Sequence, residues 1–142
     1  MATRVVVDSN VVFSALRSVN RGFRRLLYLP AYEFYAPKYL IVEIFEHKER
    51  LLTKAKAPPA EVYDYLDTVL QKIDFVSNDY ISTAHYLEAY RLCKDVDEDD
   101  TPFLALALEL NAQFWSRDEA LKADLRRKGF VNFFDELTGY ET

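Results

Sequence analysis

The sequence predicts an α/β fold in which helices cover both faces of a mostly parallel central sheet. Short runs of β-branched and aromatic residues alternate with amphipathic helical segments along the chain, which is the order expected when crossover helices join parallel strands. The first run, Val5–Val7, is apolar at every position, as is typical of a strand covered on both faces. With 142 residues, the chain has the size of one compact domain, and we expect a single domain over residues 1–142.

Prolines and capping residues set the element boundaries in the first half of the chain. Ser9 or Asn10 can cap the first helix, and Pro30 ends the second. Pro37 fits the first turn of the next helix because its missing N–H has no hydrogen bond to lose there. The elements predicted in this half are strands over residues 5–7 and 33–36, and helices after residue 9, over 22–29, from 37 to 51 and after 59.

The second half continues the alternation. Thr101 and Pro102 predict a helix start, since a capping residue is followed by a first-turn proline, and Gly129 ends the helix that begins at Glu119. An acidic loop over residues 95–100 precedes Thr101. The elements predicted in this half are strands over residues 73–76, 112–116 and 130–134, and helices over 82–92, 103–110 and 119–128.

Composition excludes several classes of protein. No apolar stretch approaches the roughly 20 residues that cross a bilayer, and Cys93 is the single cysteine, which leaves no disulfide and no cysteine-rich zinc site. We therefore expect a soluble, cytoplasmic protein with no membrane partner. The net charge of −5 is unevenly distributed, with a net +5 through Lys56 and a net −10 from Ala57 onward. One part of the chain can bind a polyanion while the other supplies acidic groups.

Acidic residues follow two predicted strands and precede a predicted helix. Asp8 follows the first strand, Asp118 follows the strand that contains Trp115, and Asp99 and Asp100 lie before the helix that starts at Thr101. In open α/β sheets the ligand site lies outside the carboxyl ends of the strands, so these side chains can converge there. Carboxylate oxygens are the ligands that Mg²⁺ prefers. The sequence therefore indicates a metal-dependent hydrolase.

This order of acidic residues resembles the PIN-domain nuclease family. The resemblance is carried by Val5-Val6-Val7-Asp8-Ser9-Asn10, by Glu43 within a helix, by residues 97–107, and by Trp115-Ser116-Arg117-Asp118. It implies a three-layer α/β/α sandwich and hydrolysis of RNA by metal-activated water, with Asp8, Glu43, Asp100 and Asp118 as catalytic residues. The implied cofactor is Mg²⁺ or Mn²⁺, bound by Asp8, Asp100 and Asp118.

The resemblance also assigns accessory roles. Asn10 is expected to orient Asp8 or a phosphate, and Ser116 lies where the family commonly has a small hydroxyl residue. Asp97 and Asp99 lie so close to Asp100 that each is an alternative metal ligand, and Glu46 is the alternative to Glu43. An RNA path is predicted along the basic side of the chain, at Arg17, Arg21, Arg24 and Arg25, with Lys48, Arg50, Lys54 and Lys56 following Glu43. Further expected partners are a second copy in a homodimer and a small antitoxin protein, if the domain is the toxin of a toxin–antitoxin pair.

Other interpretations of the same residues stay open. Taken alone, Asp8, Asp99, Asp100 and Asp118 are also good helix-start residues, and the arginines are also typical of a solvated face. A catalytically silent PIN scaffold that binds RNA or protein is one alternative function. An aspartate-based phosphatase is another, although such enzymes normally carry a second Asp where this chain has Asn10.

Overall fold

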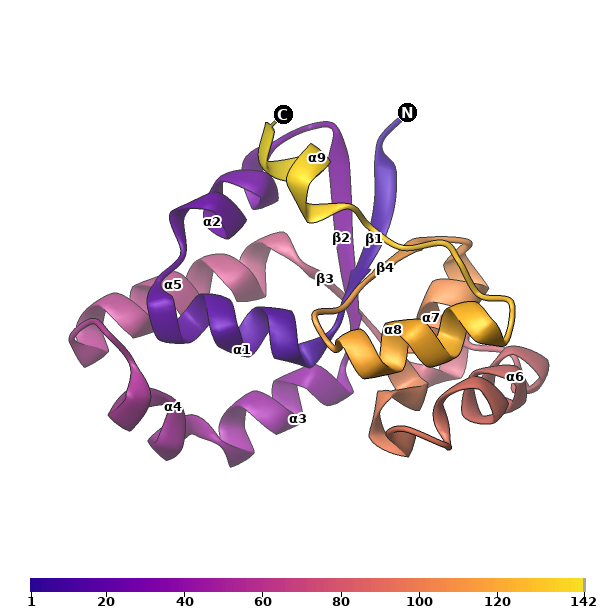
Figure 1. The fold of residues 1–142 in the computed structure, drawn as a ribbon. Helices are drawn as coiled ribbons and strands as arrows, with labels where there is room; N and C mark the ends of the chain where they lie inside the picture. The colour runs from indigo at the N-terminus through magenta and orange to yellow at the C-terminus, as the bar shows by residue number, and fades with distance from the viewer. Residues whose placement is uncertain (142) are drawn as a thin grey trace.

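A computed structural model, which describes residues 1–141, confirms the α/β architecture (Figure 1). One sheet has the strand order β3-β2-β1-β4, and every pairing between neighbouring strands is parallel. The strands are β1 (Thr3–Val7), β2 (Tyr32–Pro37), β3 (Asp74–Val76) and β4 (Gln113–Trp115). All three valines of β1 are fully buried, as predicted for a central strand with helices on both faces.

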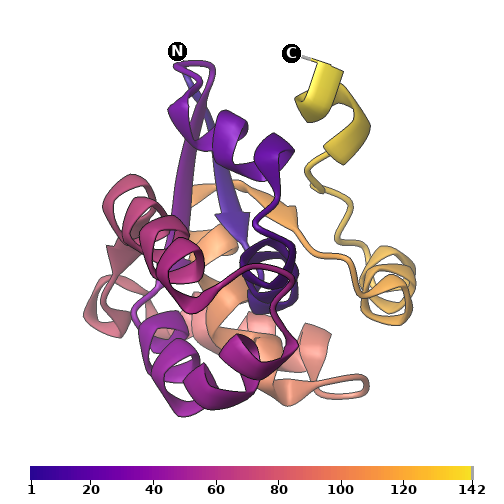
Figure 2. The ribbon, with the colours of Figure 1, turned by 90° about the vertical axis from the view of Figure 1, so that its left-hand side faces the viewer.

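Helices cover the sheet on both sides. α7 (Thr101–Leu110) packs against β1, β2 and β4, and α6 (Thr83–Cys93) packs on α7. On the opposite side, α2 (Arg21–Tyr28) contacts β2 and α5 (Pro59–Lys72) (Figure 1). Figure 2 looks at the molecule from this second side, with α5 in front of the strands. The remaining helical elements are α1 (Ser9–Ser18), α3 (Tyr39–Glu46), α4 (Lys48–Lys54), α8 (Glu119–Arg127), α9 (Glu136–Glu141) and the short 3-10 turns η1 (Asn78–Tyr80) and η2 (Glu98–Asp100).

Aromatic side chains join the C-terminal segment to the sheet. The fully buried Trp115 of β4 lies with its ring centroid 4.6 Å from that of Phe134 and 5.4 Å from that of Phe23. Its indole Nε1 donates to Glu136 Oε1 at 2.6 Å. Because aromatic pairs at this spacing add to the free energy of area burial, the cluster fixes β4 and the start of α9 relative to each other.

The chain order places a topological switch point at the carboxyl ends of β1 and β4. After β1 the chain builds β2 and then β3 on one side, and it returns to add β4 on the other side of β1. The backbone N–H of Asp8 donates to the carbonyl of Trp115 at 2.8 Å, so the two strand ends are in direct contact. A crevice at this position is where open α/β sheets bind ligands.

Several predicted boundaries are wrong. Asp8, not Ser9 or Asn10, is the N-cap of α1. Pro37 is the last residue of β2, at the strand end, where a missing N–H is tolerated. The helix expected through Leu51 is interrupted at His47, which separates α3 from α4.

The strand predicted over residues 130–134 does not form. Phe133 makes only an isolated bridge with Phe114, formed by the hydrogen bonds of Phe114 with Asn132 and Phe134. The N–H of Phe133 donates to the carbonyl of Val131 at 2.9 Å, within the same segment. The helix α9 that follows was not predicted. Within residues 1–141, no helix is long and apolar enough to span a membrane.

Replacing Leu104 by Ala tests the packing of α7 against the sheet. Leu104 is fully buried, so the Leu104→Ala substitution is expected to lower the free energy of unfolding by about 2–5 kcal/mol, as for other buried leucines. The matched control is Leu87→Ala on α6, because Leu87 is 65% exposed and the change is expected to stay within about 0.5 kcal/mol. Urea unfolding followed by circular dichroism measures both values, and equal losses in the two variants would contradict this packing.

Candidate functional site

Two buried carboxyl groups meet at the switch point. Asp8 is fully buried at the end of β1, and Asp100 is 8% exposed at the start of α7. Their side chains are hydrogen-bonded to each other, which requires a proton on one of them because a carboxylate oxygen has none to donate. Burial is the largest cause that raises the pKa of both groups, and the neighbouring negative charge of Asp8 raises the pKa of Asp100 further.

Asp8 is held in place by donors from the ends of both strands. The backbone N–H of Ser9 donates to Asp8 Oδ1 at 2.8 Å, and the hydroxyl of Ser116 donates to Oδ2 at 2.9 Å. Asn10 Nδ2 lies 3.3 Å from both Asp8 Oδ2 and Ser116 Oγ, while Asn10 Oδ1 accepts from the backbone N–H of Arg117 at 3.2 Å. Asn10 and Ser116 therefore both contact the Asp8 carboxyl group and hold it in this orientation.

Asp118 lies beside this pair and caps a helix. Its Oδ1 accepts from the backbone N–H of Leu121 at 3.0 Å, at the N-terminus of α8, and its own N–H donates to Ser116 Oγ at 3.2 Å. The negative charge of Asp118 contributes to the raised pKa of both Asp8 and Asp100. Asp118 thus caps α8 and also acts electrostatically on the Asp8–Asp100 pair.

Asp100 differs from the other two aspartates because it makes no capping hydrogen bond. It occupies the N-cap position of α7 without a side-chain cap, and its carboxyl group instead contacts Asp8. Helix capping alone therefore does not explain an Asp at this position. Asp97 and Asp99 are exposed, and Asp97 Oδ1 accepts from the N–H of Asp99 at 3.0 Å in η2. The structure brings Asp100, rather than Asp97 or Asp99, into contact with Asp8.

Glu43 faces the same site from α3. It is half-buried, and its Oε1 is buried without a hydrogen-bond partner among the described residues. Burial, followed by the negative charge of Asp8, raises the pKa of Glu43 to about 7. Glu46, the alternative considered from the sequence, is exposed. A buried carboxyl oxygen without a partner is costly, and in native structures such a group calls for an unseen ligand.

The carboxylate oxygens at this site are suitable ligands for a hard divalent cation. In the metal-free protein they do not form a complete metal site. Within residues 1–141, no three His, Cys, Asp or Glu side chains form a ready-made metal site, and Asp8 and Asp118 each accept a backbone hydrogen bond. The available ligands are carboxylate oxygens, as Mg²⁺ and Mn²⁺ require. Asp8, Asp100 and Glu43 would supply oxygen ligands to such a cation, and its charge would compensate the negative charges that gather there.

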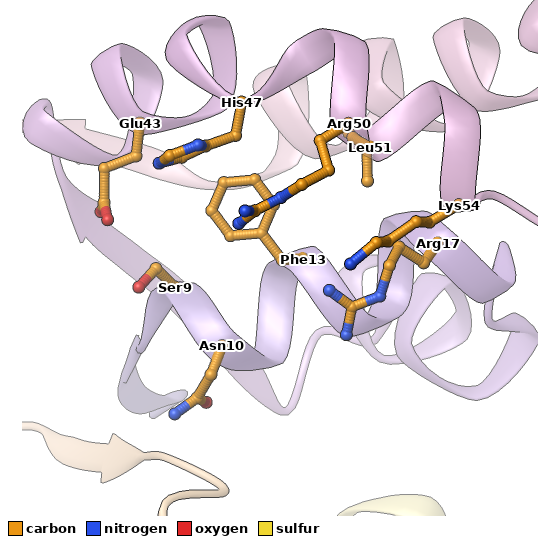
Figure 3. Close-up of a pocket in the computed structure, with 9 residues that line it drawn as sticks. All are labelled: Ser9, Asn10, Phe13, Arg17, Glu43, His47, Arg50, Leu51 and Lys54. Atoms are coloured by element: carbon orange, nitrogen blue, oxygen red, sulfur yellow. The ribbon is translucent and has the colours of Figure 1, made fainter.

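A cavity of about 330 Å³ opens beside Glu43, between α1 and the α3–α4 pair (Figure 3). Its residues occupy two helical stripes. Figure 3 shows the Glu43 carboxylate at one end and three cationic side chains at the other, with the ring of Phe13 between them. The lining residues are Ser9, Asn10, Phe13 and Arg17 from α1, and Glu43, His47, Arg50, Leu51 and Lys54 from the facing segment.

The arginines predicted to bind RNA are divided between two places. Arg17 lines the cavity, whereas Arg24 pairs with Asp64 at 3.6 Å and Arg25 donates to the carbonyl of Tyr140 at 2.7 Å. Arg21 is exposed on α2 and does not line the cavity. Val19 causes the separation, because its left-handed backbone (φ 44°) turns the chain between α1 and α2.

The basic wall of the cavity joins Arg50 and Lys54, which the sequence indicated as part of an RNA path, to His47, which it did not. Glu43, His47, Arg50 and Lys54 are spaced by four, three and four residues, and this spacing places side chains on one helical face. The sequence therefore contained the spacing of this stripe. It did not show that the stripe lies opposite Phe13 of α1. The support from the C-terminus was also missed: Arg117 Nε donates to Glu136 Oε1 at 2.7 Å, which ties α9 to the loop that carries Ser116 and Asp118.

These features define a class of α/β domain with an acidic site at the carboxyl ends of neighbouring parallel strands. A comparison with protein-family models matches residues 6–128 to the PIN domain, and the chain belongs to the PIN domain family. PIN domains are generally nucleases and typically use divalent metal ions. The comparison with curated proteins gave no match.

The stability of the metal-free protein is expected to fall as pH rises. Carboxyl groups whose pKa is higher in the folded state stabilise it fully below their unfolded pKa, and they lose this contribution as pH rises through the folded value. For Glu43 the window runs from 4.5 to about 7, and the Asp8–Asp100 pair acts in the same direction. Asp100→Asn removes one of these charges, so in chelator at pH 8 it is expected to stabilise the protein by at least about 1.4 kcal/mol, the equivalent of one pH unit in a pKa.

Urea unfolding at pH 5 and pH 8 measures this effect, and the gain from Asp100→Asn should shrink at pH 5. Asp79→Asn, at an exposed aspartate of η1, is the matched control and should show no such trend. An Asp100→Asn variant that is equally destabilised at both pH values would contradict the proton-sharing pair.

Proposed function

We propose that this protein is a Mg²⁺- or Mn²⁺-dependent endoribonuclease that hydrolyses RNA phosphodiester bonds. The observation that carries the proposal is the contact between the buried carboxyl groups of Asp8 and Asp100. Both groups can be ionised at neutral pH only if a cation compensates their charge. Membership of the PIN domain family supports the same chemistry.

Each residue of the site has its own role in this proposal. Asp8, Asp100 and Asp118 would hold the ion, with Glu43 completing the set directly or through water. A bound divalent ion lowers the pKa of water and stabilises charge on the attacked phosphate. Ser116 and Asn10 fix the Asp8 carboxylate by the hydrogen bonds described above, and Asp97 and Asp99 add negative charge at the rim. No histidine is needed as a base.

RNA is the proposed substrate because the acidic site adjoins a basic cavity. Arg17, Arg50 and Lys54 line that cavity, and none of them forms an ion pair with another described residue. Such cations supply affinity for a phosphate backbone without reading base sequence. The family resemblance extends the proposal to a toxin with a small antitoxin partner, to a homodimer and to a cytoplasmic location.

The alternatives make different predictions for the same residues. A silent scaffold has no use for the buried, unpartnered Glu43 oxygen, which costs stability without chemistry to compensate. An aspartate-based phosphatase would need an acidic group at position 10, where Asn10 is instead fixed between Asp8 and the backbone of Arg117. Both observations favour the nuclease.

Cleavage of a mixed-sequence single-stranded RNA tests the proposal. Purified protein should cleave the RNA with Mg²⁺ or Mn²⁺ and not with chelator. Asp8→Asn and Asp118→Asn are each expected to reduce the rate by at least about 100-fold, since even outer-shell partners of metal ligands cost ten- to hundredfold. Gel electrophoresis of end-labelled RNA gives the rates.

The matched control is Asp79→Asn, which removes a carboxylate outside the site and should cleave at the native rate. RNA binding without cleavage under every metal condition would favour the silent scaffold, and metal-independent cleavage that survives Asp8→Asn would refute the proposal.

A further inference from the structure

We infer that the cavity between α1 and the α3–α4 pair binds one unpaired nucleotide next to the scissile phosphate, with its phosphate on Arg17, Arg50 and Lys54 and its base against Phe13. The inference rests on the proposed ribonuclease function and adds to it a subsite, built by side chains of α1 and α4, that binds one nucleotide of the RNA. The polarity of the cavity is its starting point, since Glu43 lies at one end and the cations gather at the other (Figure 3).

The cationic end of the cavity is built from two separate helical segments. Arg17 is in the last turn of α1, and Arg50 and Lys54 are one turn apart on α4. All three side chains line the cavity, and Figure 3 shows them at the end away from Glu43. Like charges repel, so such a group of cations, without ion-pair partners among the described residues, is stabilised by an anion between them. A phosphate is such an anion, and guanidinium groups bind phosphate well through paired hydrogen bonds.

Phe13 supplies the apolar contact that a base requires. It is half-buried between the acidic and basic ends of the cavity (Figure 3), and the ring of His47 meets it edge-on, with centroids 6.0 Å apart and an interplanar angle of 75°. Aromatic side chains beside a cationic groove are the usual platform for unpaired bases, because every base has a face that can stack.

The size of the cavity selects a single strand. At about 330 Å³ it lies near the lower end of the range for small-ligand pockets, so it admits one nucleotide and not a base pair. Bases of a duplex are stacked and unavailable to an aromatic side chain, whereas unpaired bases can turn outward. A strand that runs along the cavity would place its next phosphate beside Glu43 and Asp8.

Binding measurements in chelator test this inference without relying on cleavage. The probe is a short fluorescein-labelled single-stranded RNA of mixed sequence, titrated at several salt concentrations. Arg17→Ala, Arg50→Ala and Lys54→Ala are each expected to weaken binding at least about fivefold and to reduce the slope of log affinity against log salt by up to about 0.7, the value for one phosphate contact on a single strand.

Phe13→Leu separates stacking from charge, because it keeps an apolar side chain in the half-buried position and removes only the ring. It is expected to weaken binding at least about fivefold with an unchanged salt slope. The matched control is Arg4→Ala, which removes an exposed arginine of β1 outside the cavity and should leave affinity and slope at native values. Circular dichroism checks that each variant is folded.

Two results would overturn the inference: native affinity in the cavity variants, or an equal loss in Arg4→Ala. Equal competition by a duplex of the same sequence would also overturn it. The outcome is separable from that of the proposed function. Native cleavage with unchanged affinity in the cavity variants removes only this inference, whereas selective loss of binding by a protein that never cleaves RNA supports it and removes only the nuclease.

Discussion

The contact between the carboxyl groups of Asp8 and Asp100 is the constraint on which the rest of the structure depends. Burying two carboxylates side by side costs free energy unless a proton or a cation lies between them. The fold creates this contact from apolar packing, since the fully buried valines of β1 carry Asp8 into the interior and the buried α7 presents Asp100. The two neighbouring carboxyl groups that could bind a cation therefore lower the stability of the metal-free protein.

The acidic residues around this pair serve in two ways. Asp8 and Asp118 cap α1 and α8 while their charges act on the site, so part of their cost is offset by helix capping. Asp100 and the Oε1 atom of Glu43 have no such structural bond, which leaves them available to a ligand. The basic cavity that begins at Glu43 leads from the acidic side chains of the site to the cationic side chains of Arg17, Arg50 and Lys54.

The sequence predicted the parts of the site that depend on strand order and missed those that depend on turns between helices. Residues after two strands of a parallel sheet must meet at one edge, so the proximity of Asp8 and Asp118 followed from their positions. The separation of Arg17 from Arg24 and Arg25 did not, because the left-handed Val19 is a conformation that a β-branched residue rarely adopts.

Other differences have similar local causes. The break at His47 carries no glycine or proline, so periodicity alone extended one helix across it. The C-terminal helix α9 contacts the loop after β4 through Glu136 and the aromatic cluster of Trp115, and no local pattern reports such a long-range contact. Prediction from sequence was therefore reliable for the sheet and its acidic edge, and less so for the helices that shape the cavity.

The most direct test of the central claim is the number of protons released when Mg²⁺ binds. Titration calorimetry at pH 7 in buffers of different ionisation enthalpy measures this number, because metal ligands must lose their protons on binding. If the cation replaces the proton held between Asp8 and Asp100, the native protein releases protons and Asp100→Asn releases fewer. Binding of Mg²⁺ with no proton release, or with the same release in Asp100→Asn, would contradict the account.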